Sequence, residues 1–314
     1  MYFPGEVSLQ FVALWALFTI VTVQLLYNLF RPFLVSSKPR SGEWAVVTGA
    51  TDGIGKALAM QLASRGYKML LVARSAKRLT ETADEIRLRF GESSNQLEIK
   101  TLVIDFNSAD EAKYDEVVQE INQINVGILV NNVGAAYPYP MFYHEVKQDF
   151  LDMLINVNLR STLRMTAIVY KGMVSRKSGK IICIGSGASQ LPCDPLHSAY
   201  VCVKGGIEAF CRTLQVEAFQ HNISVQYQVP LLVTTKLSKC KHPSISIPSP
   251  ERFAISSMRS IDCAIPAKRG CIVCPYWFHW LQLILLRYAP GLCSWYLLKE
   301  HEKLRKRALL KLSQ

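Results

Sequence analysis

The stretch that decides the fold runs from Val46 to Gly55 and reads Val-Val-Thr-Gly-Ala-Thr-Asp-Gly-Ile-Gly. An apolar run enters a turn with three glycines, and a helix-like stretch follows from Lys56 to Arg65. Glycines let the backbone turn tightly and approach a pyrophosphate, and a helix N-terminus offers free N–H groups and a partial positive charge. The stretch therefore predicts a phosphate cradle, although glycines at this spacing also occur in ordinary turns.

Length and composition indicate one large α/β domain with appendages. The chain has 314 residues, of which 50% are hydrophobic, so a sizeable core is expected. Its 9 cysteines follow no regular framework, which is typical of free thiols in a reduced compartment. The one close pair, Cys271 and Cys274, has no partner set at zinc spacing, so no metal site is predicted.

The formal net charge is +12, which could indicate a nucleic-acid-binding protein. However, the central part of the chain has no basic stripe with interleaved aromatic residues, so we expect no nucleic-acid partner. Much of the excess positive charge lies near the two apolar ends of the chain. This distribution favours contact with an anionic membrane surface.

The N-terminal segment is predicted to be a membrane anchor. No charged residue occurs between Glu6 and Arg31, and as a helix this run would span about 36 Å, enough for a hydrocarbon core of about 30 Å. Arg31, Lys38 and Arg40 follow it, which places the C-terminal side in the cytosol. Residues 1–41 are therefore expected to form a transmembrane helix and linker, with a buried core helix as the alternative.

The central part of the chain alternates between strand and helix patterns. Helical periodicity is expected at Gly53–Arg65, Ala76–Phe90, Glu111–Ile124, Val146–Ser175 and Ser198–Gln220. The strands are expected at Trp44–Thr48, Lys68–Ala73, Leu97–Val103, Gly127–Asn131, Lys180–Ile184 and Ile223–Gln228. This alternation predicts a Rossmann-like, doubly wound parallel sheet over residues 42–240, with ligands beyond the C-terminal ends of the strands.

Three motifs occur in order on these elements, and together they identify a resemblance. They are the glycine turn from Thr48 to Gly55, Asn-Asn-Val-Gly at residues 131–134, and Tyr-Val-Cys-Val-Lys at residues 200–204. The chain thereby resembles the short-chain dehydrogenase/reductases over about residues 42–240. This resemblance implies an NADP- or NAD-dependent oxidoreductase that interconverts alcohols and ketones.

Longer stretches resemble one membrane-bound branch of that family. It includes the 17β-hydroxysteroid dehydrogenases of types 3 and 12, the latter also called very-long-chain 3-oxoacyl-CoA reductase, and hydroxysteroid dehydrogenase-like protein 1. The last of these has the most similar local motifs, at residues 137–140 and 247–250. The branch implies a hydrophobic substrate and an endoplasmic reticulum membrane, with the mitochondrion as the alternative location. The family also forms homodimers, which this sequence does not test.

The end of the second strand indicates the choice of cofactor. NAD-binding folds usually place an acidic residue there to hold the ribose 2′-hydroxyl, whereas this chain has Ala73 followed by Arg74. A guanidinium can grip a 2′-phosphate with paired hydrogen bonds, so NADP(H) is favoured. By resemblance, the further cofactor-binding residues are Gly49, Thr51, Asp52, Gly53, Ile54, Gly55, Asp105, Asn131, Tyr200, Lys204, Val233 and Thr235.

Tyr200 is the expected proton donor to a substrate carbonyl. A free phenol has a pKa of about 10, and Lys204, one helical turn away, is expected to lower it. Ser186 is expected to polarise the carbonyl, although it stands one residue farther from Tyr200 than the family pattern and Gly185 replaces the family's first serine. Ser189 is the alternative serine, and by resemblance Asn158 organises a water that relays protons.

The C-terminal part, residues 241–314, is expected to cover the substrate and meet the membrane. Residues 236–270 contain several prolines and many serines and are expected to be rich in loops. The apolar stretch Cys271–Leu286 is too short for a comfortable span and suits a buried or interfacial helix. The tail Lys299–Lys311 combines basic residues with periodic leucines, which predicts a helix on a membrane surface or a solvated charged helix.

Taken together, the sequence predicts a membrane-anchored, NADPH-dependent reductase. Its expected substrate is a ketone on a lipid, either a 3-oxoacyl-CoA or a 17-ketosteroid. The altered serine segment keeps a second hypothesis open, in which a catalytically inactive nucleotide-binding protein acts through protein partners. Oxidation of a retinoid or another alcohol is a third hypothesis.

Overall fold

A computed structural model describes residues 42–91, 97–262, 270–288 and 290–313, and short helical pieces between residues 11 and 23. Most of the predicted anchor, and the linker to residue 41, lie outside the described residues. No helix within the described ranges is both long enough and apolar enough to cross a membrane. The N-terminal transmembrane helix therefore stays a prediction.

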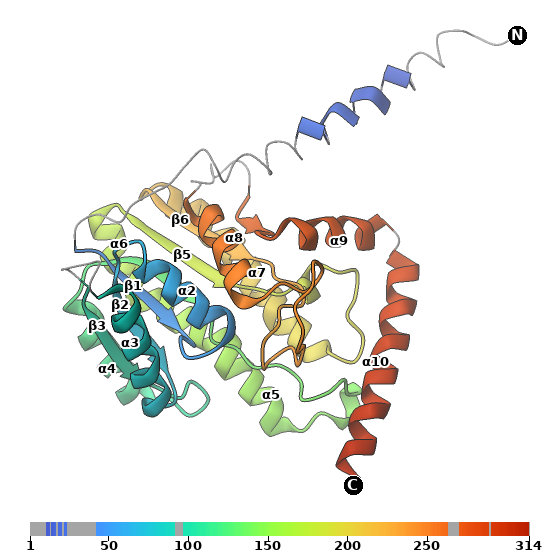
Figure 1. The fold of residues 1–314 in the computed structure, drawn as a ribbon, viewed down its shortest axis with the longest axis horizontal. Coiled ribbons are helices and arrows are strands. Elements are labelled where there is room, and N and C mark those ends of the chain that lie inside the picture. Colours follow the sequence, from blue (N-terminus) through green and yellow to red (C-terminus); the bar gives the residue numbers. More distant parts are fainter. Residues whose placement is uncertain are drawn as a thin grey trace, which may run out of the picture.

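A parallel sheet of seven strands forms the centre of the molecule (Figure 1). Its order, β3-β2-β1-β4-β5-β6-β7, reverses direction between β1 and β4, which is the point where a doubly wound sheet binds its ligand. The predicted strands are present, and β7 is an addition. The strands are β1 (Trp44–Thr48), β2 (Lys68–Ala73), β3 (Ile99–Val103), β4 (Val126–Asn131), β5 (Gly179–Ile184), β6 (Ile223–Gln228) and β7 (Ile272–Val273).

Helices cover both faces of the sheet, as the alternating pattern predicted. One apolar cluster joins the sheet to α2 (Gly53–Ala63), α3 (Ala76–Phe90) and α8 (Pro250–Asp262). A second cluster on the opposite face joins it to α4 (Glu111–Asn122), α6 (Ser161–Arg176) and α7 (Ser198–Phe219). Strands β1, β2 and β4 are buried almost throughout, which explains their continuous apolar runs.

The predicted long helix Val146–Ser175 is interrupted. It consists of α5 (Gln148–Leu154), a π-helical segment (Ile155–Arg160) and α6. Such π segments insert a wider turn into a helix and frequently occur at functional sites. Here the wider turn contains the buried Asn158, one of the predicted catalytic residues.

The prediction of loops throughout residues 236–270 is wrong for α8. Its buried face carries apolar residues, among them Phe253 and Met258, which pack against the sheet and α2. Ser249 begins the helix by accepting a hydrogen bond from the Arg252 N–H at 3.3 Å, and Pro250 follows in the first turn. Serine before proline is a recognised start signal for a helix, so this element was detectable in the sequence.

The C-terminal segment forms α9 (Trp277–Tyr288) and α10 (Pro290–Leu312), which lie at the β6 side of the sheet (Figure 1). The expectation of a half-buried helix over Cys271–Leu286 is met by α9. Its His279 is fully buried and accepts a hydrogen bond from the Leu231 N–H at 3.2 Å. Burial lowers the pKa of His279 to about 4, so the imidazole is neutral at pH 7 and fastens α9 to the loop after β6.

Candidate active site

The glycine turn is held open by contacts with the end of β4. Gly49 has φ +65°, and a Cβ on Gly55 would lie 2.2 Å from Nδ2 of Asn132 and 2.3 Å from the Gly49 carbonyl oxygen. Asn132 donates from Nδ2 to the carbonyl oxygens of Thr48 (3.0 Å) and Gly49 (3.2 Å). A side chain at Gly55 would collide with Asn132 and with the Gly49 carbonyl oxygen. Glycine at this position therefore allows the turn conformation that the predicted phosphate cradle requires.

Asp52 closes the same turn by capping α2 and gathering two cations. Its Oδ1 accepts a hydrogen bond from the Gly53 N–H at 2.7 Å, and its Oδ2 lies 2.7 Å from Nη2 of Arg78 and 3.1 Å from Nζ of Lys236. Burial alone would raise the pKa of the Asp52 carboxyl, but the hydrogen bonds from Arg78, Lys236 and Gly53 hold it below its ordinary value. Arg78 also donates to the Thr51 carbonyl oxygen at 3.0 Å.

The positively charged side chain of Arg74 follows the end of β2. Arg74 is exposed and makes no ion pair or hydrogen bond within the described ranges, so its guanidinium is available to a 2′-phosphate. Lys56, by contrast, forms an ion pair with Glu85 at 2.5 Å, which offsets the positive charge expected from it. Asp105 follows β3 at the same edge and is exposed, and its Oδ1 accepts a hydrogen bond from the Asn107 N–H at 3.0 Å.

The loop after β6 lies against the glycine turn. A Cβ on Gly53 would meet Cγ2 of Thr235 at 3.1 Å. Val233 is buried with Phe253 and Tyr276, and Ile54 from the glycine turn packs against this cluster. The structure thus brings Val233 and Thr235 to the predicted cofactor cradle, although they are far from it in the sequence.

The side chain of Asn131 does not reach this cradle. It is buried and donates from Nδ2 to Oγ1 of Thr166 at 2.9 Å, which places it inside the core between β4, β5 and α6. Its Oδ1 is buried without a hydrogen-bond partner in the part of the chain that the structure describes. Its neighbour Asn132, which sequence reasoning missed, contacts the glycine turn, and a role for Asn131 in cofactor binding stays a prediction.

Tyr200, Lys204 and Ser186 come together where β5 ends and α7 begins. The Ser186 side chain lies close enough to Tyr200 to lower the pKa of the phenol. Lys204 is buried, donates from Nζ to the Ile184 carbonyl oxygen at 3.0 Å, and lies 5.9 Å from the centre of the Tyr200 ring. Two hydroxyl groups and one ammonium thus meet at the C-terminal edge of the sheet.

The expected lowering of the pKa of Tyr200 by Lys204 is not what the structure shows. Burial raises the pKa of Tyr200, the Ser186 side chain lowers it, and the nearby Asp194 carboxylate raises it further. Burial also lowers the pKa of Lys204 to about 8. Lys204 is not among the groups that shift the pKa of Tyr200. A raised pKa keeps Tyr200 protonated, as a proton donor requires.

Asn158 lies beside the Lys204 ammonium. It is fully buried, donates from Nδ2 to the Ala135 carbonyl oxygen at 3.1 Å, and accepts from the Ala135 N–H at 3.3 Å. A Cβ on Gly134 would lie 3.0 Å from Oδ1 of Asn158 and 3.7 Å from Nζ of Lys204. Gly134 therefore leaves the space in which Asn158 and Lys204 approach each other.

A buried tyrosine explains the departure at Gly185. A Cβ on Gly185 would lie 2.1 Å from Cζ of Tyr227, so the family's serine cannot fit at this position. The Tyr227 hydroxyl accepts a hydrogen bond from the Ser186 N–H at 3.2 Å and donates to the Lys204 carbonyl oxygen at 3.1 Å. Tyr227 thereby links the segment after β5, which carries Ser186, to the helix α7, which carries Lys204.

The same network decides between the two candidate serines. Ser189 donates to Oε2 of the buried Glu208 at 2.9 Å and lies 2.9 Å from the Tyr227 hydroxyl. Its hydroxyl is therefore committed to the core, whereas Ser186 lies close enough to Tyr200 to lower the pKa of the phenol. The geometry favours Ser186 over Ser189 as the residue that would face a carbonyl.

Restoring the family motif should therefore harm this protein. We expect Gly185→Ser to lower the free energy of unfolding by about 1–3 kcal/mol, because the new side chain collides with the buried Tyr227 ring. Urea denaturation followed by circular dichroism measures this change. Gly205→Ser is the matched control, since a Cβ on Gly205 meets nothing within 4 Å. Equal stability of Gly185→Ser and the parent would contradict this packing argument.

Several loops and the C-terminal helices enclose the site. Arg305 of α10 donates to the Pro140 carbonyl oxygen at 3.4 Å and pairs with Glu145, and Lys239 donates to the Pro138 carbonyl oxygen. Arg287 of α9 donates from Nε to the Gln190 carbonyl oxygen at 3.2 Å. Segments before α5, before α7 and after β6 are thus tied to the C-terminal extension, whose role in covering the substrate stays a prediction.

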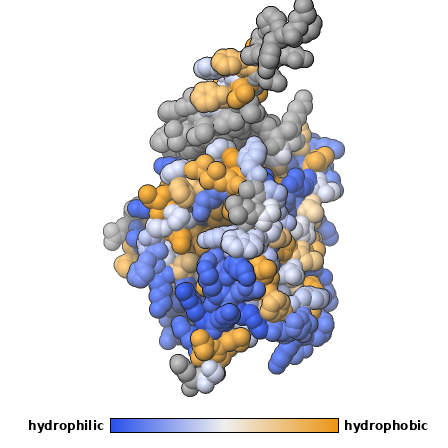
Figure 2. Space-filling model, turned by 90° about the vertical axis from the view of Figure 1, so that its right-hand side faces the viewer, coloured by the Kyte–Doolittle hydropathy of each residue, from blue (hydrophilic) through white to orange (hydrophobic). Residues whose placement is uncertain are grey.

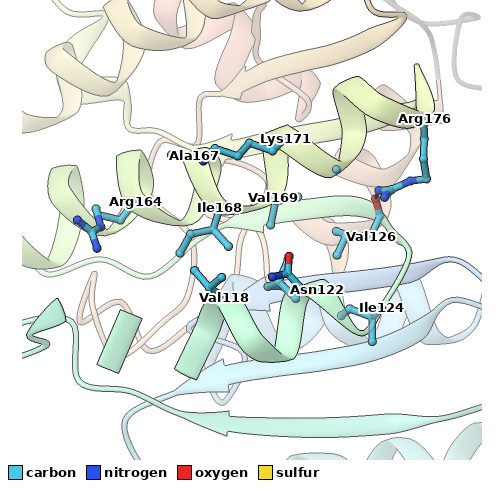
Figure 3. A pocket seen from close by; sticks show the side chains of 12 residues that line it. Val118, Asn122, Ile124, Val126, Arg164, Ala167, Ile168, Val169, Lys171 and Arg176 are labelled. Carbon is cyan, nitrogen blue, oxygen red and sulfur yellow. Dashed lines mark hydrogen bonds between the residues drawn. The ribbon is translucent and has the colours of Figure 1, made fainter. Parts of the chain in front are cut away.

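A separate groove lies on the outer helices, away from these residues. Its volume is about 510 Å³, and Val118, Ile168 and other side chains of α4 and α6 line it (Figure 3). The groove includes Val126, at the start of β4, so it extends to the sheet edge opposite the C-terminal strand ends. None of the predicted site residues lines it.

Comparisons with known proteins identify the family of the chain. Residues 43–244 match the short chain dehydrogenase family. The very-long-chain 3-oxoacyl-CoA reductase of Mus musculus is 34% identical over 314 aligned residues, covering 95% of this chain and 96% of the mouse protein. The Bos taurus protein of the same name is 40% identical, covering 71% of this chain and 70% of its own length.

Solved structures show the same fold. A metagenomic short-chain oxidoreductase in complex with NADP is 25% identical, with a TM-score of 0.60, over 71% of this chain and 92% of that chain. A short-chain dehydrogenase from Sphingobium yanoikuyae in complex with NADPH has a TM-score of 0.65 at 24% identity, over 80% of this chain and 95% of that chain. The predicted family is confirmed: the chain belongs to the short-chain dehydrogenase/reductases and is an NADP-dependent oxidoreductase.

Proposed function

We propose that this protein uses NADPH to reduce the ketone of a very-long-chain 3-oxoacyl-CoA at the endoplasmic reticulum membrane, with its catalytic domain in the cytosol. The observation that carries the chemistry is the grouping of Ser186 and Tyr200, with the buried Lys204 ammonium 5.9 Å from the centre of the Tyr200 ring. The names of the mouse and bovine relatives support the substrate class. A 17-ketosteroid is the second substrate to test, since the sequence resemblance includes enzymes of that kind.

The residues of the cradle suit NADPH. Gly49 and Gly55 leave no room for side chains, so a pyrophosphate can approach the backbone at the N-terminus of α2. Arg74 is free to pair with the 2′-phosphate, and no acidic residue stands at the end of β2 to repel it. When bound, NADPH supplies the hydride that is added to the carbonyl carbon.

The polar side chains of the site would assist hydride addition by acting on the carbonyl oxygen of the substrate. The hydroxyl groups of Ser186 and Tyr200 would donate hydrogen bonds to the carbonyl oxygen and stabilise the negative charge that develops on it. Tyr200 would then transfer its proton to that oxygen, giving the alcohol. Lys204 and Asn158 adjoin each other behind Tyr200 and would return a proton to the phenolate through water.

The experiment that tests this function measures NADPH consumption by purified, detergent-solubilised, full-length protein. The substrate panel contains long-chain 3-oxoacyl-CoA thioesters, 17-ketosteroids and retinal. We expect turnover of the thioesters to exceed that of the other compounds. NADPH binding without turnover of any compound would instead support the non-catalytic alternative, and preferential turnover of a ketosteroid would contradict the substrate class.

Arg74 should set the preference for NADPH. We expect Arg74→Ala to raise the KM for NADPH at least about 10-fold with little effect on the KM for NADH, because the variant loses a paired hydrogen bond to the 2′-phosphate. Steady-state kinetics with both cofactors measure this change. Arg89→Ala, at the other exposed end of α3, is the matched control and should leave both values unchanged. Equal effects on both cofactors would contradict a 2′-phosphate contact.

The C-terminal helices offer a surface that suits a bilayer interface. Trp277 and Leu285 of α9 and Trp295 and Tyr296 of α10 are exposed, while Lys and Arg residues follow in the second half of α10. Figure 2 shows this side of the molecule, where hydrophobic side chains gather above and below a hydrophilic region. Aromatic residues flanked by basic residues are typical of segments that lie on anionic lipid surfaces.

This surface predicts membrane binding beyond the N-terminal segment. A chain beginning at residue 42 should sediment with vesicles containing anionic lipid, and the double variant Trp277→Ser, Trp295→Ser should bind at least about fivefold more weakly. Leu88→Ser is the matched control, since Leu88 is even more exposed than the two tryptophans and lies on the distant α3. Equal binding of all three proteins would contradict the role of α9 and α10. Imaging of the full-length protein against reticular and mitochondrial markers tests the location.

A further inference from the structure

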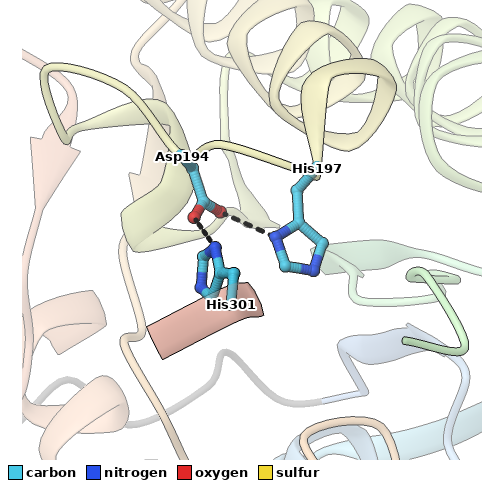
Figure 4. Close-up of side chains that lie close together, drawn as sticks. All are labelled: Asp194, His197 and His301. Carbon is cyan, nitrogen blue, oxygen red and sulfur yellow. Dashed lines mark ion pairs between the residues drawn. The ribbon is translucent and has the colours of Figure 1, made fainter. Parts of the chain in front are cut away.

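Three side chains with metal-binding donor atoms meet beside the active site. Asp194 and His197 lie in the segment before α7, and His301 extends from α10. Figure 4 shows the Asp194 carboxylate directed toward both imidazole rings, with one ion pair to each. One donor atom from each side chain lies within 4.8 Å of the other two. The two histidines and one carboxylate are a ligand set that zinc and similar cations use.

The spacing fits a cation better than direct hydrogen bonds. Nδ1 of His197 lies 3.7 Å from Oδ2 of Asp194, and Nδ1 of His301 lies 3.6 Å from Oδ1. Both separations exceed the usual hydrogen-bond length. Zinc–ligand bonds of about 2.0–2.2 Å place two ligands of a tetrahedral site about 3.4 Å apart. Since the three donor atoms lie within 4.8 Å of one another, the side chains must draw together by as much as about 1.4 Å to hold the ion.

Two polar groups of the cluster lack hydrogen-bond partners among the described residues. The Asp194 carboxylate is 13% exposed and accepts no hydrogen bond from the residues that the structure describes. Nδ1 of His197 is buried and likewise has no hydrogen-bond partner there. A buried carboxylate without donors is costly unless a positive charge compensates it. A protonated imidazole would supply the positive charge that the carboxylate needs. When both imidazoles are neutral, a bound cation would supply it instead.

We propose that Asp194, His197 and His301 bind a divalent transition-metal cation of the zinc class, with water completing its coordination. Nδ1 of His301 lies 2.8 Å from the Pro195 carbonyl oxygen, to which it donates its proton. Binding of a cation through this nitrogen requires the neutral ring to carry its proton on Nε2 instead, and the carbonyl oxygen then faces the cation as a candidate further ligand. The histidines are 104 residues apart in the numbering, so no local motif announces the site.

A cation at this site would affect the pKa of Tyr200, the proposed proton donor. The negative charge of Asp194 raises the pKa of Tyr200, and a cation bound to Asp194 opposes that effect. The ion would also fasten α10 to the segment that leads into α7, where Tyr200 lies. Metal binding would thus couple the C-terminal helix to the active site without any contact between the ion and substrate.

The test is metal binding by tag-free, full-length protein that has been stripped with a chelator. Titration with Co²⁺ should produce visible ligand-field bands that saturate at one ion per chain and disappear when Zn²⁺ is added. His301→Gln and Asp194→Asn should each weaken binding more than about 100-fold. His144→Gln is the matched control, since His144 is exposed and outside the cluster.

A second measurement uses the unaltered protein, so it does not depend on the folding of the variants. Zn²⁺ should raise the thermal unfolding midpoint of the stripped protein, and the chelator should reverse this rise. The proposal is overturned if the stripped protein gains no saturable Co²⁺ bands. It is equally overturned if His144→Gln weakens binding as much as His301→Gln, because the metal would then bind to surface histidines.

Discussion

Replacing Tyr200 with phenylalanine should reduce turnover of a ketone by about 10³-fold, within the range usual for loss of a general acid. The change removes one hydroxyl group, which is the proton donor and the neighbour of Ser186. The ring and the buried Lys204 remain, so the dissociation constant of NADPH should change by less than about threefold. Stopped-flow or steady-state oxidation of NADPH and fluorescence titration measure the two quantities.

The control for this variant is Tyr143→Phe, because Tyr143 is exposed on the segment before α5 and lacks a catalytic contact. It should behave like the parent protein. Retention of more than about a tenth of the turnover in Tyr200→Phe would contradict the role of the phenol. Loss of NADPH affinity in the same variant would indicate that Tyr200 supports binding rather than proton transfer.

The pH dependence of the parent protein follows from the same groups. Burial raises the pKa of Tyr200, so this donor stays protonated at neutral pH. Burial lowers the pKa of Lys204 to about 8, so its positive charge is present below that pH and is lost as the pH rises through it. Reduction should therefore slow above about pH 8.

Gly55→Ala should have the second largest effect. The added methyl group would lie 2.2 Å from Nδ2 of Asn132 and 2.3 Å from the Gly49 carbonyl oxygen, so the turn must open or shift. We expect the affinity for NADPH to fall more than about 100-fold and the free energy of unfolding to fall by about 1–3 kcal/mol. Isothermal titration with NADPH and urea denaturation measure these changes.

Gly205→Ala provides the comparison, since its added methyl group meets nothing within 4 Å and improves helix propensity in α7. It should bind NADPH like the parent and should be equally or more stable. If Gly55→Ala bound NADPH as tightly as Gly205→Ala, the glycine turn would not be the phosphate cradle.

The sheet was predictable because β1, β2 and β4 are continuous apolar runs between turn signals, and because strands and helices alternate along the chain. That alternation predicts a doubly wound parallel sheet but leaves the strand order open. The helix α8 was missed because the prolines and serines around it resemble a loop, although Ser249 and Pro250 mark its start. The interruption at Asn158 was also missed, because a π segment keeps nearly the same apolar pattern as an α-helix.

The catalytic residues were found through local motifs, whereas their supports come from elsewhere in the chain. Arg78 and Lys236 both pair with Asp52, yet neither spacing suggests it. Tyr227 occupies the space of the side chain that Gly185 lacks, about 40 residues earlier in the sequence. Such compensation depends on packing between separate strands, so a single sequence does not reveal it.

Two parts of the chain, the apolar N-terminal run and the helices α9 and α10, are predicted to contact the membrane. The apolar N-terminal run lies largely outside the described residues, so the structure adds nothing to it. The exposed aromatic residues of α9 and the basic residues of α10 support the C-terminal contribution independently. The vesicle experiment therefore separates the two ends of the chain.

The most direct test of the central proposal follows the hydride itself. Full-length protein is supplied with NADPH that carries deuterium at its transferable position and with a long-chain 3-oxoacyl-CoA, and the product is analysed by mass spectrometry. We expect a 3-hydroxyacyl-CoA with one deuterium on the former carbonyl carbon, formed by the parent and not by Tyr200→Phe. Unlabelled product, or equal product from both proteins, would contradict a Tyr200-dependent hydride transfer from NADPH.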